Sequence, residues 1–154
     1  MPKLSLPPIV QVTNEAQPIL GTLPGPYAYQ LVSDPGGLSQ FGAAVETLPP
    51  GSASGHRHWH GGEDEMVYIL SGEVVLVADT ETTLHQGNAV CLPAGHAVGH
   101  RLDNRSTMPA SYLVIGTRQH ADSIHYSDHD LITHKDGTPR RYLRADGTEY
   151  RRNQ

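Results

Sequence analysis

Short apolar runs recur along the middle of the chain, separated by Gly, Pro, Asn and Asp residues. Between residues 27 and 117 these runs read YAYQLV, FGAAVETL, EMVYIL, EVVLVAD, AVCLP, AVGHRL and ASYLVIGT. Several alternate apolar and polar residues or are rich in β-branched residues, and none has the apolar stripe of an amphipathic helix. The pattern predicts an all-β fold of antiparallel strands in a sandwich or barrel, with Ser71-Gly72 as a tight turn between two strands.

The two ends of the chain differ from this middle part. Residues 1–26 contain six prolines, which remove amide donors and fix φ, so we expect a mostly extended N-terminal arm. Residues 118–154 are rich in Arg, Asp, His and Tyr. This C-terminal tail could be disordered, could cover the barrel mouth or could clasp a second subunit, and its Tyr and Leu side chains make disorder the least favoured of the three. We therefore predict an N-terminal arm, a barrel over residues 27–117 and a C-terminal tail.

Composition narrows the class of protein. A length of 154 residues suits one domain, and with a net charge of −5 and scattered basic residues the chain lacks the continuous positive surface that nucleic acid requires. No stretch is long and apolar enough to span a membrane. The single cysteine, Cys91, cannot form an internal disulfide, and its apolar neighbours predict a buried thiol. We expect a soluble, cytoplasmic protein.

The segment SGHRHWHGGEDE carries the clearest chemical signal. His56, His58 and His60 occupy alternate positions, so on a strand they point to one face while Arg57 and Trp59 point to the other. Imidazole nitrogens that converge in this way, with a carboxylate near them, suit a divalent metal. Glu65 begins the next apolar run and can return beside the histidines, either as a ligand or as a general base beside metal-bound water.

The remaining residues of this segment allow simpler interpretations. His56 is more readily a neighbour of the site than a ligand, because its spacing to Glu65 fits less well. Trp59 is expected to be a packing anchor. Glu63 and Asp64 are interpreted as solvated loop residues.

Two spaced motifs resemble those of the cupin superfamily. His58-x-His60, four residues, Glu65, six residues and Gly72 resemble the first cupin motif, and Gly87, Pro93, Gly95 and His100-x3-Asn104 resemble most of the second. Gly51 lies one residue too far from His58, and four residues rather than two separate Gly95 from His100. The longer loop resembles single-domain bacterial cupins that carry R-H-W-H, P-A-G followed by G-H, and N-R-S.

The resemblance implies a double-stranded β-helix, or jelly-roll barrel, with arms at both ends. It also implies one divalent ion, Zn, Fe, Mn, Ni or Cu, bound by His58, His60, Glu65 and His100. His96 could compete for the fourth position, but His100 keeps the spacing to Asn104 and lies in an apolar run, so His96 is expected in a loop at the barrel mouth. Cupins of this kind commonly dimerise through sheet faces and exchanged N-terminal arms, and we expect a homodimer.

Three functions are compatible with such a site. The first is an enzyme of the isomerase, lyase or dioxygenase type that acts on a small molecule, with the ion as Lewis acid and Glu65 as catalytic carboxylate. The second is a module that binds or senses a small ligand without turnover. The third is a purely structural ion, which requires a closed shell of ligands. The fold alone cannot choose among them.

Overall fold

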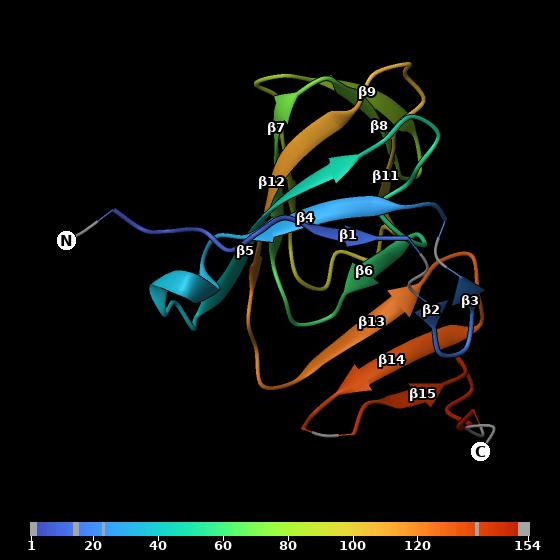
Figure 1. The fold of residues 1–154 in the computed structure, drawn as a ribbon. Coiled ribbons are helices and arrows are strands. Elements are labelled where there is room, and N and C mark those ends of the chain that lie inside the picture. Colours follow the sequence, from blue (N-terminus) through green and yellow to red (C-terminus); the bar gives the residue numbers. More distant parts are fainter. Residues whose placement is uncertain (1–2, 14–15, 23, 138, 151–154) are drawn as a thin grey trace.

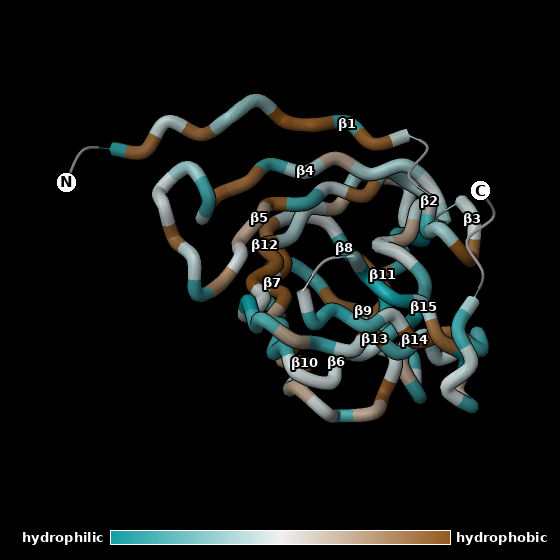
Figure 2. The backbone as a smooth tube through the Cα atoms, turned by 90° about the horizontal axis from the view of Figure 1, so that it is seen from below, coloured by the Kyte–Doolittle hydropathy of each residue, from teal (hydrophilic) through white to brown (hydrophobic). Residues whose placement is uncertain are grey.

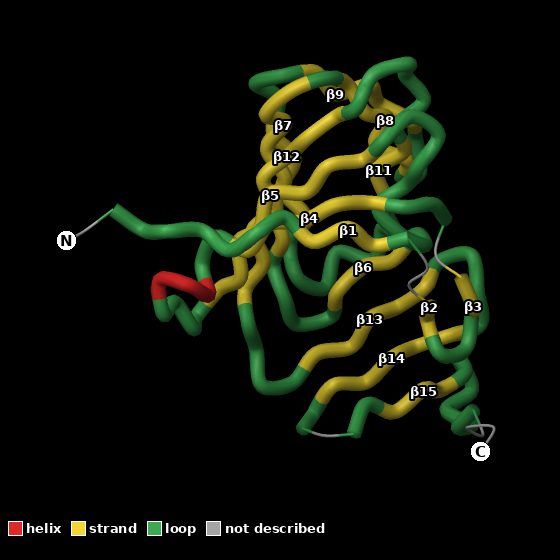
Figure 3. Tube along the Cα trace, viewed as in Figure 1, coloured by secondary structure: helices red, strands yellow, loops and turns green. Residues whose placement is uncertain are grey.

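The protein is described from a computed structural model over residues 3–13, 16–22, 24–137 and 139–150. The fold is nearly all β (Figures 1 and 3), and its one helix within these residues is a short 3-10 turn, Asp34–Gly36. The prediction of an all-β jelly-roll barrel is confirmed. Within the same residues, no helix has the length and apolarity needed to cross a membrane.

Two sheets face each other to form the barrel. The larger has the order β1 (Val10–Val12), β4 (Tyr27–Leu31), β5 (Phe41–Leu48), β12 (Ala110–Thr117), β7 (Glu65–Ser71) and β10 (Ala89–Leu92). The smaller has the order β11 (Arg101–Asp103), β8 (Glu73–Val77) and β9 (Glu81–His85). All the strand pairs are antiparallel.

The apolar core lies between these sheets. Leu48, Ile69 and Tyr112 come from the larger sheet, and Val74 and Leu102 come from the smaller. On β7 and β12 the core residues lie two positions apart, Val67 with Ile69 and Ala110 with Tyr112, because the side-chain period of a strand is two. The alternation of apolar and polar residues in the sequence therefore indicates which face of each strand is buried in the core.

The tight turn predicted at Ser71-Gly72 links β7 to β8. Gly72 has a φ of 74°, and a Cβ atom there would lie 2.8 Å from the Pro109 carbonyl oxygen and 2.9 Å from the Cα of Ala110. Both the backbone conformation and the close approach therefore require glycine.

A third sheet continues the barrel wall into the C-terminal segment. It has the order β15 (Arg141–Leu143), β14 (Leu131–Lys135), β13 (Asp122–Tyr126) and β6 (His58–His60). An isolated bridge between His58 and His100 joins β6 to the segment that enters β11. Figure 1 shows β13, β14 and β15 in succession below β6, at the lower end of the barrel. The segment after residue 117 is thus built onto the barrel by strand pairing, and Leu131 is only 1% exposed there.

The N-terminal segment joins the larger sheet at one edge. Strand β1 pairs with β4, and the Gln30 side-chain amide donates a hydrogen bond of 2.8 Å to the Pro7 carbonyl. A small hairpin of β2 (Ala16–Gln17) and β3 (Gly21–Thr22) follows. The segment before β1 runs away from the barrel, and hydrophobic positions alternate with polar ones along it (Figures 1 and 2). Its apolar side chains Leu4, Leu6 and Ile9 are exposed.

Candidate metal centre

Strand β6 places its histidines opposite the segment that leads into β11. The His58 N–H donates to the His100 carbonyl over 3.2 Å, and the His100 N–H donates to the His58 carbonyl over 3.0 Å. This reciprocal pair brings the two rings to 5.3 Å between centroids, and the His60 ring lies 5.2 Å from that of His58. Gly99, the residue before His100, lets Ser127 approach closely, because a Cβ atom at Gly99 would lie 2.6 Å from the Cβ of Ser127.

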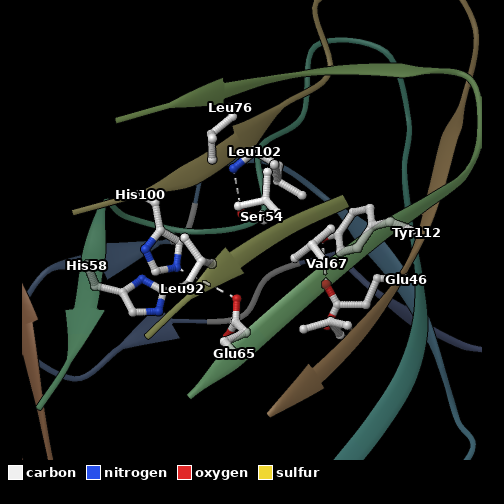
Figure 4. Close-up of a pocket in the computed structure, with 12 residues that line it drawn as sticks. Glu46, Ser54, His58, Glu65, Val67, Leu76, Leu92, His100, Leu102 and Tyr112 are labelled. Atoms are coloured by element: carbon white, nitrogen blue, oxygen red, sulfur yellow. Dashed lines mark hydrogen bonds and ion pairs between the residues drawn. The ribbon is translucent and has the colours of Figure 1, made fainter. Parts of the chain in front are cut away.

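Next to these rings the barrel encloses a cavity of about 190 Å³ (Figure 4). Half of its twelve lining residues are aliphatic, and five of the six polar ones fall into two groups. His58, His100 and Glu65 lie together at one side, and Tyr112 and Glu46 lie together at the other. The full lining comprises Glu46, Ser54, His58, Glu65, Val67, Leu76, Val90, Leu92, His100, Leu102, Tyr112 and Val114.

Hydrogen bonds fix the orientation of two of the histidines. The Nδ1 of His58 lies 2.8 Å from the His56 carbonyl oxygen, and the Nδ1 of His60 lies 2.7 Å from Oδ2 of Asp122. Both partners are acceptors, so each Nδ1 carries the proton and each Nε2 keeps its lone pair for a metal. The pKa of His58 is lowered to about 4, chiefly because burial penalises the imidazolium, so this ring is neutral at pH 7.

Glu65 and His100 also offer donor atoms that suit a divalent ion. The Nε2 of His100 lies 3.6 Å from Oε1 of Glu65, and this buried nitrogen has no hydrogen-bond partner among the described residues. Burial alone would raise the pKa of Glu65, but His100, His58 and His60 together lower it. An ionised carboxylate that faces an unpartnered buried nitrogen is a suitable donor set for a divalent ion.

A second group of potential ligands lies behind His60. The side chains of His60, Glu63 and Asp122 are close enough to one another to hold an ion. However, two ligand atoms on a tetrahedral ion are about 3.3 Å apart, given metal–ligand bonds of about 2.0 Å. The Nδ1–Oδ2 separation of 2.7 Å is a hydrogen-bond distance. Glu63 also has a cationic partner, the ammonium group of Lys135.

The other three histidines of the sequence analysis, His56, His60 and His96, do not line the cavity, although His60 shares a small hollow with Glu65 and His100. His56 contributes its carbonyl to His58, and its ring packs edge-on against His129 at 5.1 Å. His96 is exposed in the loop before His100 and lines a small hollow that it shares with His60 and His100. Trp59 faces away from the ligands and stacks flat on His125 of β13, with ring centroids 3.9 Å apart.

Two expectations about single residues were wrong. Cys91 is exposed, because its neighbours Val90 and Leu92 face the cavity and the alternation on β10 turns the thiol outward. Glu63 is not a solvated loop residue. Its side chain is 15% exposed, accepts a hydrogen bond of 2.8 Å from the Gln119 N–H and pairs with Lys135.

Sequence reasoning missed three polar residues near the site. The Tyr112 hydroxyl donates to Oε2 of Glu46 over 2.6 Å inside the cavity, and burial followed by the nearby Glu46 raises the pKa of Tyr112 well above its usual value. The third is Asp122, the partner of His60. Glu46 and Tyr112 stand in phase with the inward residues Leu48 and Ala110, which is a usable signal, whereas Asp122 lies 62 residues from His60 with no sequence cue to their pairing.

Comparisons with known proteins identify the family and the fold. A profile of the cupin domain matches residues 44–116. The crystal structure of a sugar phosphate isomerase of the cupin superfamily from Silicibacter pomeroyi is 34% identical, with 97% of each chain covered and a TM-score of 0.84. A protein from Acidithiobacillus ferrooxidans, described as a candidate sugar phosphate isomerase, is 26% identical over 82% of each chain, with a TM-score of 0.73.

A more distant structure shares the fold alone. A protein from Thermotoga maritima, described as a predicted oxalate decarboxylase, is 23% identical over 70% of this chain and 94% of its own, with a TM-score of 0.55. A search of curated proteins gave no match.

Proposed function

The chain belongs to the cupin superfamily, and we propose that it is an enzyme that uses one divalent ion to isomerise a small hydroxy-carbonyl compound. The ion would be held by His58, His60, His100 and Glu65. The observation that carries the proposal is the convergence of three groups on one side of the cavity: the oriented ring of His58, the unpartnered buried Nε2 of His100 and the ionised carboxylate of Glu65. The names of the two similar proteins, one given as a sugar phosphate isomerase and the other as a candidate for that activity, support the reaction class.

The residues of the cavity suit a proton transfer between neighbouring carbons. A bound divalent ion would polarise the substrate carbonyl and so acidify the adjacent C–H. Glu65 could take that proton and return it to the neighbouring carbon, while the hydroxyl proton passes to the former carbonyl oxygen, so that the hydroxyl and carbonyl groups exchange positions. The six aliphatic side chains of the lining lower the local polarity, which strengthens the electrostatic interactions among the ion, the carboxylate and the substrate.

The charges of the cavity favour an uncharged group inside it. None of the twelve lining residues, all of which the structure describes, is Lys or Arg, and two of them are carboxylates, Glu46 and Glu65. The volume of about 190 Å³ corresponds to roughly six water molecules at about 30 Å³ each. We therefore propose that a short hydroxy-carbonyl segment enters the cavity and that any phosphate of the substrate stays outside it.

The test measures proton abstraction directly. The protein is loaded with Mn²⁺, Fe²⁺ or Zn²⁺ and incubated in D₂O with aldoses and ketoses of three to six carbons, with and without a phosphate group. Exchange of the hydrogen α to the carbonyl is followed by NMR. We expect exchange with at least one of these compounds. In Glu65→Gln the rate should fall by about a hundredfold or more, a typical contribution of a general base.

Glu73→Gln is the matched control, because Glu73 is an exposed carboxylate on β8 outside the cavity lining. It should exchange at the rate of the unmodified protein. If the panel gives only binding, with equal affinity in the unmodified protein and Glu65→Gln, the non-catalytic ligand-binding function replaces the enzyme. If Glu65→Gln retains both ion and full rate, Glu65 is not the base.

We further propose that the protein acts as a homodimer in the cytoplasm. The exposed apolar side chains Leu4, Leu6 and Ile9 on the N-terminal segment give this segment a surface to bury on a second copy. A free thiol at Cys91 is compatible with a reducing compartment. Analytical ultracentrifugation should show a dimer that weakens on removal of residues 1–18, and a monomeric mass for the full chain would contradict the dimer.

A further inference from the structure

Asp122 is a buried carboxylate that the proposed reaction does not yet use. It begins β13, and its side chain is only 1% exposed. Its two oxygens have separate partners, since Oδ2 is 2.7 Å from the Nδ1 of His60 and Oδ1 accepts a hydrogen bond of 2.8 Å from the Gly62 N–H. The Asp122 carboxylate therefore contacts both His60, a proposed ligand, and Gly62 in the loop that follows it.

The backbone of β13 holds this carboxylate in register. Ile124 is paired with His60, and the Gly61 N–H donates to the Ser123 carbonyl over 2.8 Å. Asp122 consequently falls beside Gly62. A Cβ atom at Gly62 would lie 3.1 Å from the Ala121 carbonyl oxygen, so the Gly61-Gly62 pair allows the loop to approach the start of β13 closely.

The neighbouring charges leave Asp122 as the anionic partner of His60. Glu63 Oε2 is also near, at 3.9 Å from the Nδ1 of His60, but its other oxygen is engaged by the ammonium of Lys135 on β14. Asp122 is both closer and within hydrogen-bond distance. A carboxylate that accepts from Nδ1–H fixes the tautomer and the ring orientation of a metal-binding histidine and raises its basicity.

We infer that Asp122 is the positioning residue for His60. The sheet formed by β13, β14 and β15 thereby contributes to the metal centre, because it holds the carboxylate that orients a ligand. The inference rests on the proposed ion site. It assigns to the C-terminal segment a role distinct from that of a lid or a subunit clasp, because the segment reaches the site from behind a ligand and not across the cavity.

The first test needs no substitution at Asp122. Long-range ¹H–¹⁵N NMR of the chelator-treated protein above pH 7.5 reports the tautomer of each histidine, and the signals of His60 are identified by their loss in His60→Gln. The inference predicts the Nδ1–H tautomer for His60, with Nε2 unprotonated. The Nε2–H tautomer would overturn it.

The second test measures ion affinity. Zn²⁺ and Co²⁺ dissociation constants are obtained by competition with a chromophoric chelator for the unmodified protein, Asp122→Asn and Asp136→Asn. Asparagine has one acceptor oxygen where aspartate has two, so it cannot serve both His60 and Gly62. We expect the affinity of Asp122→Asn to be 10- to 100-fold lower, the usual effect of losing such a partner.

Asp136→Asn is the control, because it removes an exposed carboxylate beyond β14 that is paired with Arg141. Its affinity should stay within about twofold of the unmodified protein, since an exposed ion pair contributes little. An unchanged affinity in Asp122→Asn, when the unmodified protein binds the ion, overturns the inference and leaves the proposed function standing. If the unmodified protein binds no ion, both are overturned. Should Asp122→Asn fail to fold, as judged by its melting curve without metal, the NMR measurement decides.

Discussion

The asparagine of the second motif should be a structural residue, and Asn104→Ala tests this. Asn104 is 1% exposed. Its Nδ2 donates to the carbonyls of Leu48 over 2.8 Å and Met108 over 2.9 Å, and its Oδ1 accepts from the backbone N–H and the hydroxyl of Ser106. These four bonds tie the turn before β12 to the end of β5.

The loss follows from the surroundings of each bond. A net hydrogen bond contributes about 1 kcal/mol, and orphaning a buried group costs about 1–3 kcal/mol. The bond to Leu48 is buried, whereas water can replace the partners at the more exposed Ser106 and Met108. Asn104→Ala should therefore lower the free energy of unfolding by about 2–3 kcal/mol. With an m-value of about 2 kcal/mol/M in urea, the midpoint falls by roughly 1–1.5 M.

Urea unfolding in the presence of chelator, followed by the fluorescence of the single tryptophan, Trp59, is a suitable assay. Chelator removes any stabilisation by bound ion. Asn88→Ala is the matched control, because the Asn88 side chain is exposed and accepts one hydrogen bond, from the His85 N–H over 2.9 Å. It should cost less than about 1 kcal/mol. Equal losses in the two variants would refute the structural role of Asn104.

Three further predictions follow from packing and charge. Leu131→Ala should cost about 2–5 kcal/mol because Leu131 is 1% exposed; a loss below about 1 kcal/mol on thermal unfolding would contradict the packing of β14. Burial, followed by Glu46, raises the pKa of Tyr112 in the folded state, so its contribution to stability is present below about pH 10, the unfolded value, and falls above it. The urea midpoint should therefore fall further between pH 8 and pH 10.5 in the unmodified protein than in Tyr112→Phe. Equal falls in the two proteins would argue against the raised pKa. Gly99→Ala should cost about 1–3 kcal/mol through overpacking against Ser127, and adding Ser127→Gly should restore most of the melting temperature; no recovery would place the clash elsewhere.

The barrel could be predicted because its signals are local. Each short strand records its buried side in the alternation of its own residues, and glycines such as Gly72 mark backbone conformations that other residues avoid. His58, Glu65 and His100 were placed together from motif spacing, and the structure brings all three to the same cavity. The assignment of these residues as ligands of an ion stays a prediction.

The parts that could not be predicted depend on pairings between distant segments. The register of β13 on β6 sets Asp122 beside His60, and the approach of β14 sets Lys135 beside Glu63. No local sequence pattern indicates either pairing, since both depend on which strand edge the C-terminal segment joins. The exposure of Cys91 was misjudged for a different reason, namely that apolar neighbours on a strand lie on the opposite face from the residue between them.

The central claim is that one divalent ion is held by His58, His60, His100 and Glu65. Crystals of the metal-loaded protein, measured above and below the absorption edge of the added ion, test it most directly. We expect one anomalous peak per chain, about 2.0–2.2 Å from the Nε2 atoms of the three histidines and from a carboxylate oxygen of Glu65. A peak instead at the Nδ1 side of His60, between Glu63 and Asp122, or no peak at either position, would contradict it.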